Sequence, residues 1–281
     1  MIQTSKETDE KIAGARRAAK SSDEALVPTE FWCLHGAVGA ASDWRALGKG
    51  LAEIGASTRA VDLWRFLQCE SVSMPDFGKR LNADSQGEVS RGQKRILFGY
   101  SMGGRLALHA LLEKGPWDAA VIISANPGLR DPAEISARRA SDTVWATQAL
   151  TLAWGDFLQK WNSQPILGGA MRDEREDKKL IQRRREIARS FVDWSVTNQQ
   201  PLWNRLPEIQ IPTLWIAGET DTKYRAIAEE AVALLPNATL AIAPNAGHRV
   251  PWENEAWLLG AIEEWRGFKR NLGDFVSSRE R

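Results

Sequence analysis

The chain has 281 residues, of which 43% are hydrophobic, and its formal net charge is +1 at neutral pH. A single core can grow to roughly 250–300 residues, so one α/β domain accounts for this length. So small a charge creates no field that attracts nucleic acid or an anionic membrane. Two cysteines are too few for a disulfide framework, and no apolar run reaches the roughly 18 residues that span a bilayer. We therefore expect a cytoplasmic protein with neither nucleic acid nor a membrane as a partner.

Short apolar runs alternate with helical patterns along the chain. This alternation predicts an α/β fold with a mostly parallel central sheet and helices on both faces. Only about thirty residues precede the first clear strand, so we expect small opening antiparallel strands to be missing, short or hidden in the tail. The predicted strands are Phe31–Leu34, Thr58–Leu63, Arg95–Tyr100, Ala119–Ser124, Pro212–Gly218 and Ala238–Ala243, and the predicted helices include Ser42–Gly55, Arg105–Glu113 and Trp252–Phe268.

The alternation breaks between residues 130 and 206. That stretch is rich in arginine, lysine, glutamate and tryptophan, has helical periodicity and shows little strand character. We interpret residues 130–206 as a helical lid inserted between two strands of the sheet. The core is then made of residues 27–129 and 207–270, and the chain ends in tails at residues 1–26 and 271–281.

The strongest chemical signal lies where the third predicted strand meets a helix. The sequence there is Gly99-Tyr100-Ser101-Met102-Gly103, a G-x-S-x-G match. A serine in this pattern sits on a tight strand-to-helix turn that exposes its hydroxyl, and glycines are needed where the backbones come close. An apolar strand before the motif and an apolar helix after it give the context that this turn requires. We interpret Ser101 as the reactive hydroxyl; the alternative is an ordinary glycine-rich turn.

Three histidines are candidates for the base that activates this serine. His109 lies on the outgoing helix, which carries it away from the turn, so we interpret it as a packed histidine. His35 precedes the serine, against the order serine, acid, histidine of this type of triad. His248 follows the last predicted strand, and loops at the carboxyl ends of parallel strands gather at one edge. We predict that His248 is the base, against the alternative of a surface-loop histidine.

An acid that orients the base is expected between the serine and the histidine. Asp221 follows the strand Pro212–Gly218 and would hold the imidazole tautomer. Glu219 is its rival, and a helix N-cap is the alternative role for Asp221. For the oxyanion hole we expect the N–H of Met102 and the N–H of Ala37, in the glycine-rich turn after the first strand. This ordered set predicts an α/β-hydrolase fold with a helical lid.

Other chemistries find little support in the sequence. No G-x-x-x-x-G-K-[ST] loop, H-E-x-x-H motif or paired cysteine motif occurs. We therefore expect neither a metal nor a cofactor. The basic run Arg183-Arg184-Arg185 fits a solvated helix face as well as a functional role.

Further motifs resemble one family within this superfamily. The discriminating motifs are the arginine directly after Gly103 and Gly104 of the serine turn, an N-P-G-L turn and a W-x-x-Q-P segment. Together with the serine and histidine motifs, their order is similar to that of 2-succinyl-6-hydroxy-2,4-cyclohexadiene-1-carboxylate synthases, enzymes of menaquinone biosynthesis. The match spans residues 31–268 and rests on His35-Gly36, Gly99–Arg105, Asn126–Leu129, Trp161–Pro165, Gly218–Tyr224 and Ala246–His248.

The resemblance implies a lyase that eliminates pyruvate from a succinyl-cyclohexene carboxylate. In that family the serine, activated by its histidine, abstracts a ring proton instead of attacking a carbonyl. The substrate carries several carboxylates, which the guanidinium fork binds well. The positions that match substrate-binding residues of the family are Arg105, Arg138 and Arg184. The match of Arg184 is ambiguous, because Arg183 and Arg185 adjoin it. The positions that match pocket-lining residues are Tyr100 and Trp161. The alternative role of each arginine is surface solubility.

Two segments depart from the family. Asp62-Leu63-Trp64-Arg65-Phe66 stands where relatives usually carry a D-x-P-G-H-G turn, and Asn162 replaces a frequent tyrosine. Both departures leave the triad intact and bear on the identity of the substrate.

Three hypotheses therefore stand. The first is the pyruvate-eliminating lyase. The second is a hydrolase of the same fold that cleaves a carboxylic ester, or a carbon–carbon bond of a ring-cleavage product, through a serine nucleophile. The third is a non-catalytic binding protein, which the intact triad argues against. Arginines beside an aromatic lid favour the first over an esterase, whose pocket would be more apolar. The oligomeric state stays open.

Overall fold

The computed structural model describes residues 28–86, 92–168 and 179–277, and the predicted tail at residues 1–26 lies outside them. Six strands form one sheet in the order β2-β1-β3-β4-β5-β6, and every neighbouring pair is parallel. The predicted parallel sheet is confirmed, and the described part of the chain contains no antiparallel strand. The strands are β1 (Thr29–Leu34), β2 (Ala56–Val61), β3 (Lys94–Tyr100), β4 (Ala119–Ile123), β5 (Thr213–Gly218) and β6 (Ala238–Ala243).

The central strands contain continuous apolar runs, such as Phe31–Leu34 and Ile96–Phe98, because both faces of the sheet are buried there. Successive side chains point to opposite faces of the sheet. In β1, Trp32 and Leu34 therefore join one core cluster, while Phe31 and Cys33 join the other. The same alternation through β3, β4 and β5 divides the core into two layers, one on each side of the sheet.

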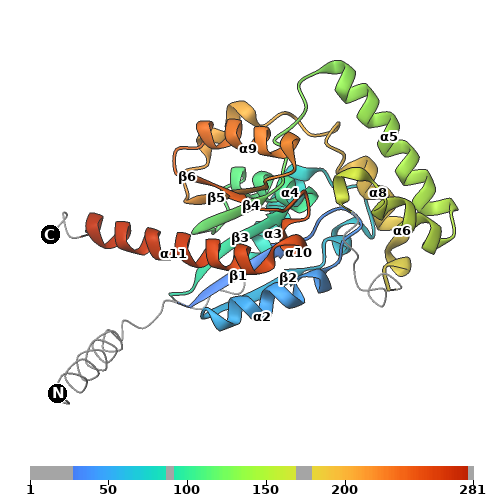
Figure 1. The fold of residues 1–281 in the computed structure, drawn as a ribbon. Helices are drawn as coiled ribbons and strands as arrows, with labels where there is room; N and C mark the ends of the chain where they lie inside the picture. The colour runs from blue at the N-terminus through green and yellow to red at the C-terminus, as the bar shows by residue number, and fades with distance from the viewer. Residues whose placement is uncertain (1–27, 87–91, 169–178, 278–281) are drawn as a thin grey trace, which may run out of the picture.

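Helices cover each layer, as Figure 1 shows. The helices α3 (Met74–Gln86), α4 (Met102–Leu112) and α9 (Thr222–Leu234) contribute apolar residues to the larger cluster. The helices α2 (Arg45–Glu53), which follows the 3₁₀ helix η1 (Ala41–Trp44), and α11 (Glu255–Ser277) contribute to the smaller one. The prediction of helices on both faces is confirmed.

The bounds predicted for the second strand and for the closing helix were wrong. β2 begins and ends two residues earlier than predicted. It ends at Val61 because Asp62 accepts a hydrogen bond from Trp64 N and starts the 3₁₀ helix η2 (Leu63–Leu67). The closing helix is divided at Asn254 into α10 (Val250–Glu253) and α11, since the Asn254 side chain accepts from Trp257 N. α11 continues into the predicted tail as far as Ser277, and the sequence after Phe268 contains no proline that would end the helix.

The segment between β4 and β5 is helical, as predicted. The described residues of this lid contain no strand, and Figure 1 shows its helices as a group beside the sheet. Asp131 caps the first helix by accepting from Ala133 N at 2.9 Å. The lid elements are α5 (Pro132–Thr151), α6 (Trp154–Asn162) and α8 (Arg184–Asp193), with the 3₁₀ helices η3 (Pro165–Leu167), η4 (Ile181–Arg183) and η5 (Trp203–Glu208).

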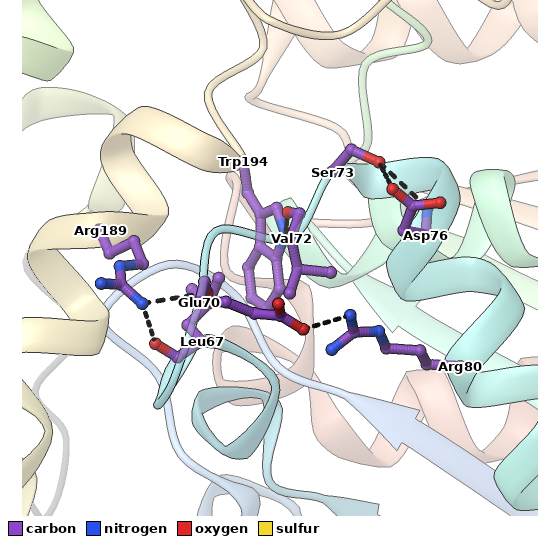
Figure 2. A network of polar contacts seen from close by, with 8 residues as sticks. All are labelled: Leu67, Glu70, Val72, Ser73, Asp76, Arg80, Arg189 and Trp194. Atoms are coloured by element: carbon purple, nitrogen blue, oxygen red, sulfur yellow. Dashed lines mark hydrogen bonds and ion pairs between the residues drawn. The ribbon is translucent and has the colours of Figure 1, made fainter.

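Hydrogen bonds from the lid hold the loop that follows η2. Figure 2 shows Arg189 of α8 donating to the carbonyl oxygens of Leu67, at 2.6 Å, and Glu70, at 3.0 Å. The indole of Trp194 donates to Val72 O at 2.9 Å. Lid and core are therefore joined by directional contacts to backbone, in addition to apolar packing.

Among the described segments, no helix has both the length and the apolar content that crossing a bilayer requires.

Gly103 leaves no space for a side chain, because a Cβ there would overlap the carbonyl oxygens of Leu34 and His35. Gly155, in α6, has no heavy atom within 4 Å of the same position. We expect Gly103→Ala to lower the free energy of unfolding by about 1–3 kcal/mol. Gly155→Ala, the matched control, should leave it unchanged or raise it by up to about 1 kcal/mol. Urea denaturation of both variants measures the difference, and equal effects would contradict the close packing.

Candidate active site

Ser101 occupies the sharp turn between β3 and α4. Its backbone has φ 52° and ψ −112°, a conformation that is unusual for a residue with a side chain. Its N–H donates to Ile123 O at 2.8 Å, which ties the turn to the neighbouring strand. Gly99 and Gly103 flank it where the backbones of strand and helix come close. This strained turn presents the hydroxyl at the carboxyl edge of the sheet.

His248 connects this hydroxyl to a carboxylate. Its Nε2 lies 3.0 Å from Ser101 Oγ, and its Nδ1 lies 2.8 Å from Asp221 Oδ2. An ionised carboxylate only accepts hydrogen bonds, so Nδ1 carries the proton and donates to it. Nε2 is then left to accept from the serine hydroxyl. His248 and Asp221 are 4% and 9% exposed, so water competes little for these bonds.

Asp221 also caps a helix. Its second carboxylate oxygen, Oδ1, accepts from Tyr224 N at 3.2 Å at the start of α9. The two roles weighed for Asp221 in the sequence are therefore filled together, one by each oxygen. The rival Glu219 instead accepts from Asn245 N at 2.9 Å and is exposed.

The first glycine-rich turn lies against the same site. Residues Gly36, Ala37, Val38 and Gly39 line the cavity together with Met102. We call these four residues the oxyanion loop, after the role that the sequence predicts for Ala37. Gly39 N–H donates to Gly36 O at 3.1 Å and closes the turn. Both predicted donors, the amides of Ala37 and Met102, thus belong to residues that lie at the cavity with Ser101.

A cavity of about 330 Å³ opens over Ser101 between the core and the lid. This volume is at the lower end of the range that is typical of small-molecule sites. From the core it is lined by Ser101 and His248, and from the lid by Arg138, Trp145 and Trp161. A bound molecule would therefore contact both parts of the chain.

A family model described as "Alpha/beta hydrolase family" matches residues 33–261, which include the serine turn, the acid and the histidine. The chain belongs to the α/β hydrolase family. The strand order and the strand-to-helix turn at Ser101 agree with this membership.

Two curated relatives of this α/β hydrolase carry the same descriptive name. A putative 2-succinyl-6-hydroxy-2,4-cyclohexadiene-1-carboxylate synthase of Bacillus subtilis is 29% identical over 260 residues, which cover 88% of this chain and 89% of the relative. A 2-succinyl-6-hydroxy-2,4-cyclohexadiene-1-carboxylate synthase of Serratia proteamaculans is 29% identical over 234 residues, which cover 80% and 88%. The similarity therefore extends over most of both chains.

Solved structures support the fold. MenH from S. aureus superposes with a TM-score of 0.76 at 22% identity, covering 88% of this chain and 96% of that chain. An esterase from Exiguobacterium antarcticum gives a TM-score of 0.64 at 15% identity, covering 84% and 91%. At these identities the two structures show a shared architecture.

Arg105 brings a buried positive charge to the cavity of this α/β hydrolase. It is 8% exposed and donates to Trp194 O at 2.8 Å and to Gln199 Oε1 at 3.3 Å. No carboxylate of the described residues pairs with it, whereas Arg138 in the same lining is paired with Asp142 at 2.8 Å. Burial lowers the pKa of the Arg105 guanidinium to about 10, so the group stays charged at neutral pH.

Aromatic rings also line the cavity. Trp161 meets Trp145 edge to face, with centroids 5.1 Å apart, and it meets Phe191 at 5.3 Å. Tyr100 lies 5.7 Å from the His248 ring, and burial raises the pKa of its hydroxyl above the usual value. Both residues that were matched to a pocket from the sequence, Tyr100 and Trp161, lie at the cavity.

Arg184 does not line the cavity, and its predicted place in the binding site was wrong. Its Nε donates to Ala149 O and its Nη2 to Leu152 O, each at 2.8 Å. A cation at the end of α5 stabilises carbonyl groups that lack helical partners. Arg183 pairs with Asp62 at 2.8 Å instead, and Arg185 is exposed.

Arg249, Trp252 and Tyr224 are among the lining residues that sequence reasoning did not assign to the site. Arg249, 5% exposed, directly follows the histidine and donates to Asn162 Oδ1 at 2.7 Å. Trp252 lies 5.1 Å from Tyr100, and Tyr224 meets the His248 ring at 4.4 Å. Tyr224 belongs to the same motif as Asp221, and Arg249 directly follows His248. Their closeness in sequence to predicted site residues could have identified them as part of the lining.

His109 is buried in α4, outside the cavity lining. Burial, with Arg105 and Arg205 nearby, lowers its pKa to about 4 from an ordinary value of about 6.5. The unfolded chain binds this proton more tightly, so the stability that neutral His109 contributes is present above pH 6.5 and is lost as the pH falls towards 4.

When the pH falls from 6.5 to 4, the free energy of unfolding should decrease less in His109→Leu than in the unchanged protein. We expect the two decreases to differ by on the order of 3 kcal/mol. Urea denaturation across this range measures the difference, with pH 8 as the common reference. Parallel losses in the two proteins would show that His109 does not titrate as described.

Proposed function

We propose that this protein is a carbon–oxygen lyase of menaquinone biosynthesis that eliminates pyruvate from a succinyl-cyclohexene carboxylate. The observation that carries the proposal is a buried guanidinium, that of Arg105, in the same lidded cavity as the hydroxyl of Ser101. A carboxylated substrate suits such a cavity, because a buried cation gains most from an ionic partner. The likeness to two proteins named as synthases of this kind supports the assignment.

Ser101 acts as the base through His248. The hydroxyl gives its proton to Nε2 while its oxygen takes a proton from a carbon of the substrate ring. Asp221, at 2.8 Å from Nδ1, stabilises the imidazolium that forms and holds the ring in the required tautomer. The 3.0 Å separation of Oγ and Nε2 is short enough for direct proton transfer.

The electron pair of the broken C–H bond then drives the elimination. It forms a new double bond in the ring, and the C–O bond to the departing three-carbon acid breaks. The departing oxygen keeps the electron pair of the broken C–O bond and receives the proton that His248 Nε2 took from Ser101, and the enol released becomes pyruvate. Charge that develops on a neighbouring carbonyl oxygen is stabilised by the N–H groups of Ala37 and Met102.

Cations and aromatic rings position the substrate. Arg105 binds a carboxylate from the core side, and Arg138 binds from the lid. Tyr100 and Trp161 lie against the ring of the substrate. We assign the protein to the cytoplasm on the sequence grounds given above, with a small-molecule carboxylate as its partner.

The alternative is hydrolysis by the same residues. If Ser101 Oγ attacked an ester carbonyl, His248 would take its proton and the oxyanion loop would hold the tetrahedral oxygen. The contact that favours this reading is the direct Oγ to Nε2 hydrogen bond, which serves a nucleophile as well as a base.

A two-substrate assay separates these functions. Purified protein is offered the succinyl-cyclohexene carboxylate intermediate and p-nitrophenyl acetate, and pyruvate and p-nitrophenol are followed. We expect fast pyruvate release and feeble ester cleavage, and a fall of several orders of magnitude for Ser101→Ala. Fast ester cleavage without pyruvate would support the hydrolase, and unchanged turnover in Ser101→Ala would exclude both enzymes.

Arg105 and Arg184 offer a matched pair of variants, because each donates to carbonyl oxygens of the lid but only Arg105 lines the cavity. We expect Arg105→Lys to raise KM for the carboxylated intermediate about tenfold to a hundredfold, since a lysine lacks the planar fork. Arg184→Lys should change it less than about threefold. The KM of uncharged p-nitrophenyl acetate is the control for both, and equal KM effects on the intermediate would contradict this role of Arg105.

A further inference from the structure

The oxyanion loop has a conformation that needs support from its surroundings. Val38 has φ 53°, in the left-handed region, and is 1% exposed. For a β-branched residue this is a genuine outlier, which persists only where neighbouring groups fix it. Ala37, whose N–H we place in the oxyanion hole, directly precedes it. Relaxation of Val38 would therefore move the amide that the reaction needs.

Trp64 contacts this loop and does not belong to the cavity lining. Its indole Nε1 donates to Gly39 O at 2.8 Å, and the residue is 1% exposed. Its ring centroid lies 4.9 Å from that of His35, which immediately precedes the loop. Trp64 is not among the residues that line the cavity, so it acts on the loop and not on a substrate.

Both ends of the segment that carries Trp64 are fixed. At its start, Asp62 caps η2 through Oδ1, and its Oδ2 accepts from Arg183 of the lid at 2.8 Å. At its end, Leu67 O accepts from Arg189 at 2.6 Å, as Figure 2 shows. The indole is therefore held at a defined position relative to the loop. This is the segment in which the chain departs from the D-x-P-G-H-G turn of its relatives.

We propose that Trp64 is a positioning residue, which holds the oxyanion loop in its strained conformation through the carbonyl group of Gly39. The segment 62–67 thereby takes part in catalysis without touching the substrate. The proposal rests on the oxyanion role of Ala37 in the proposed function. It does not depend on the lyase reaction, because a hydrolase would use the same loop.

The test compares two buried indoles. Trp64→Phe removes the donor to Gly39 O and keeps an aromatic ring. Trp117→Phe is the matched control, since Trp117 is 5% exposed and donates to Asn82 Oδ1 at 2.8 Å, outside the cavity lining. We expect Trp64→Phe to lower kcat about tenfold to a hundredfold with KM changed less than about threefold. Trp117→Phe should keep kcat within about twofold while losing similar thermal stability.

Both kcat values are measured by pyruvate release and by p-nitrophenyl acetate cleavage. If the unchanged protein cleaves only the ester, the lyase fails while Trp64 is still tested on that reaction. A kcat for Trp64→Phe within twofold of the unchanged protein would overturn the proposal. Equal losses of kcat in the two variants would overturn it too, because they would reflect general destabilisation.

Phenylboronic acid supplies a readout that needs no turnover. Ser101 Oγ bonds to the trigonal boron, its proton passes to His248, and the tetrahedral anion places an oxygen at the oxyanion loop. We expect the Kd of this probe to rise about tenfold in Trp64→Phe and to stay within twofold in Trp117→Phe. Equal Kd values in Trp64→Phe and the unchanged protein, or no binding by the unchanged protein, would count against the role of the loop.

Discussion

The site depends on one requirement, that an imidazole lie between a hydroxyl and a carboxylate from distant parts of the chain. Ser101 follows β3, Asp221 follows β5 and His248 follows β6. These strands run parallel, so their carboxyl ends meet at one edge, and the three side chains lie within 3.0 Å of their partners there. The sheet fixes the positions at which these strands end. Each of the three side chains follows its strand directly or after a short loop, so the distances between them are well defined.

Burial gives the site its electrostatic character. His248 and Asp221 are buried, and Arg105, which lines the same cavity as His248, carries a charge at 8% exposure with no carboxylate partner among the described residues. Carrying a buried cation without a carboxylate partner is costly, and carbonyl oxygens from the lid offset part of that cost. An anionic substrate would complete the arrangement. The lid thus contributes in two ways: some of its residues line the cavity, and two others, Trp194 and Gln199, hold the guanidinium of Arg105.

Several elements could be predicted because their signals are local. The strand β3, the turn at Ser101 and the helix α4 follow from a few neighbouring residues, and the two-faced burial of β1 follows from its apolar run. The end of β2 could not be placed this way, because Asp62 caps η2 and also binds Arg183, far away in sequence. Arg184 was assigned to the cavity only because its position in the sequence matched that of a substrate-binding arginine. In the structure its guanidinium donates to carbonyl groups at the end of α5.

The sequence by itself determined the parallel α/β sheet, the serine turn, the helical lid and the order of serine, acid and histidine. The spacing of apolar residues, the positions of glycines and the residue types in loops are properties of neighbouring residues. They favour a local structure before the chain is compact. Only the tertiary structure decided which arginine reaches the cavity, that Arg249 and Trp252 line it, and that Trp64 braces the oxyanion loop. Those outcomes depend on the directions of side chains from elements that are remote in sequence, and only tertiary packing and hydrogen bonds fix such directions.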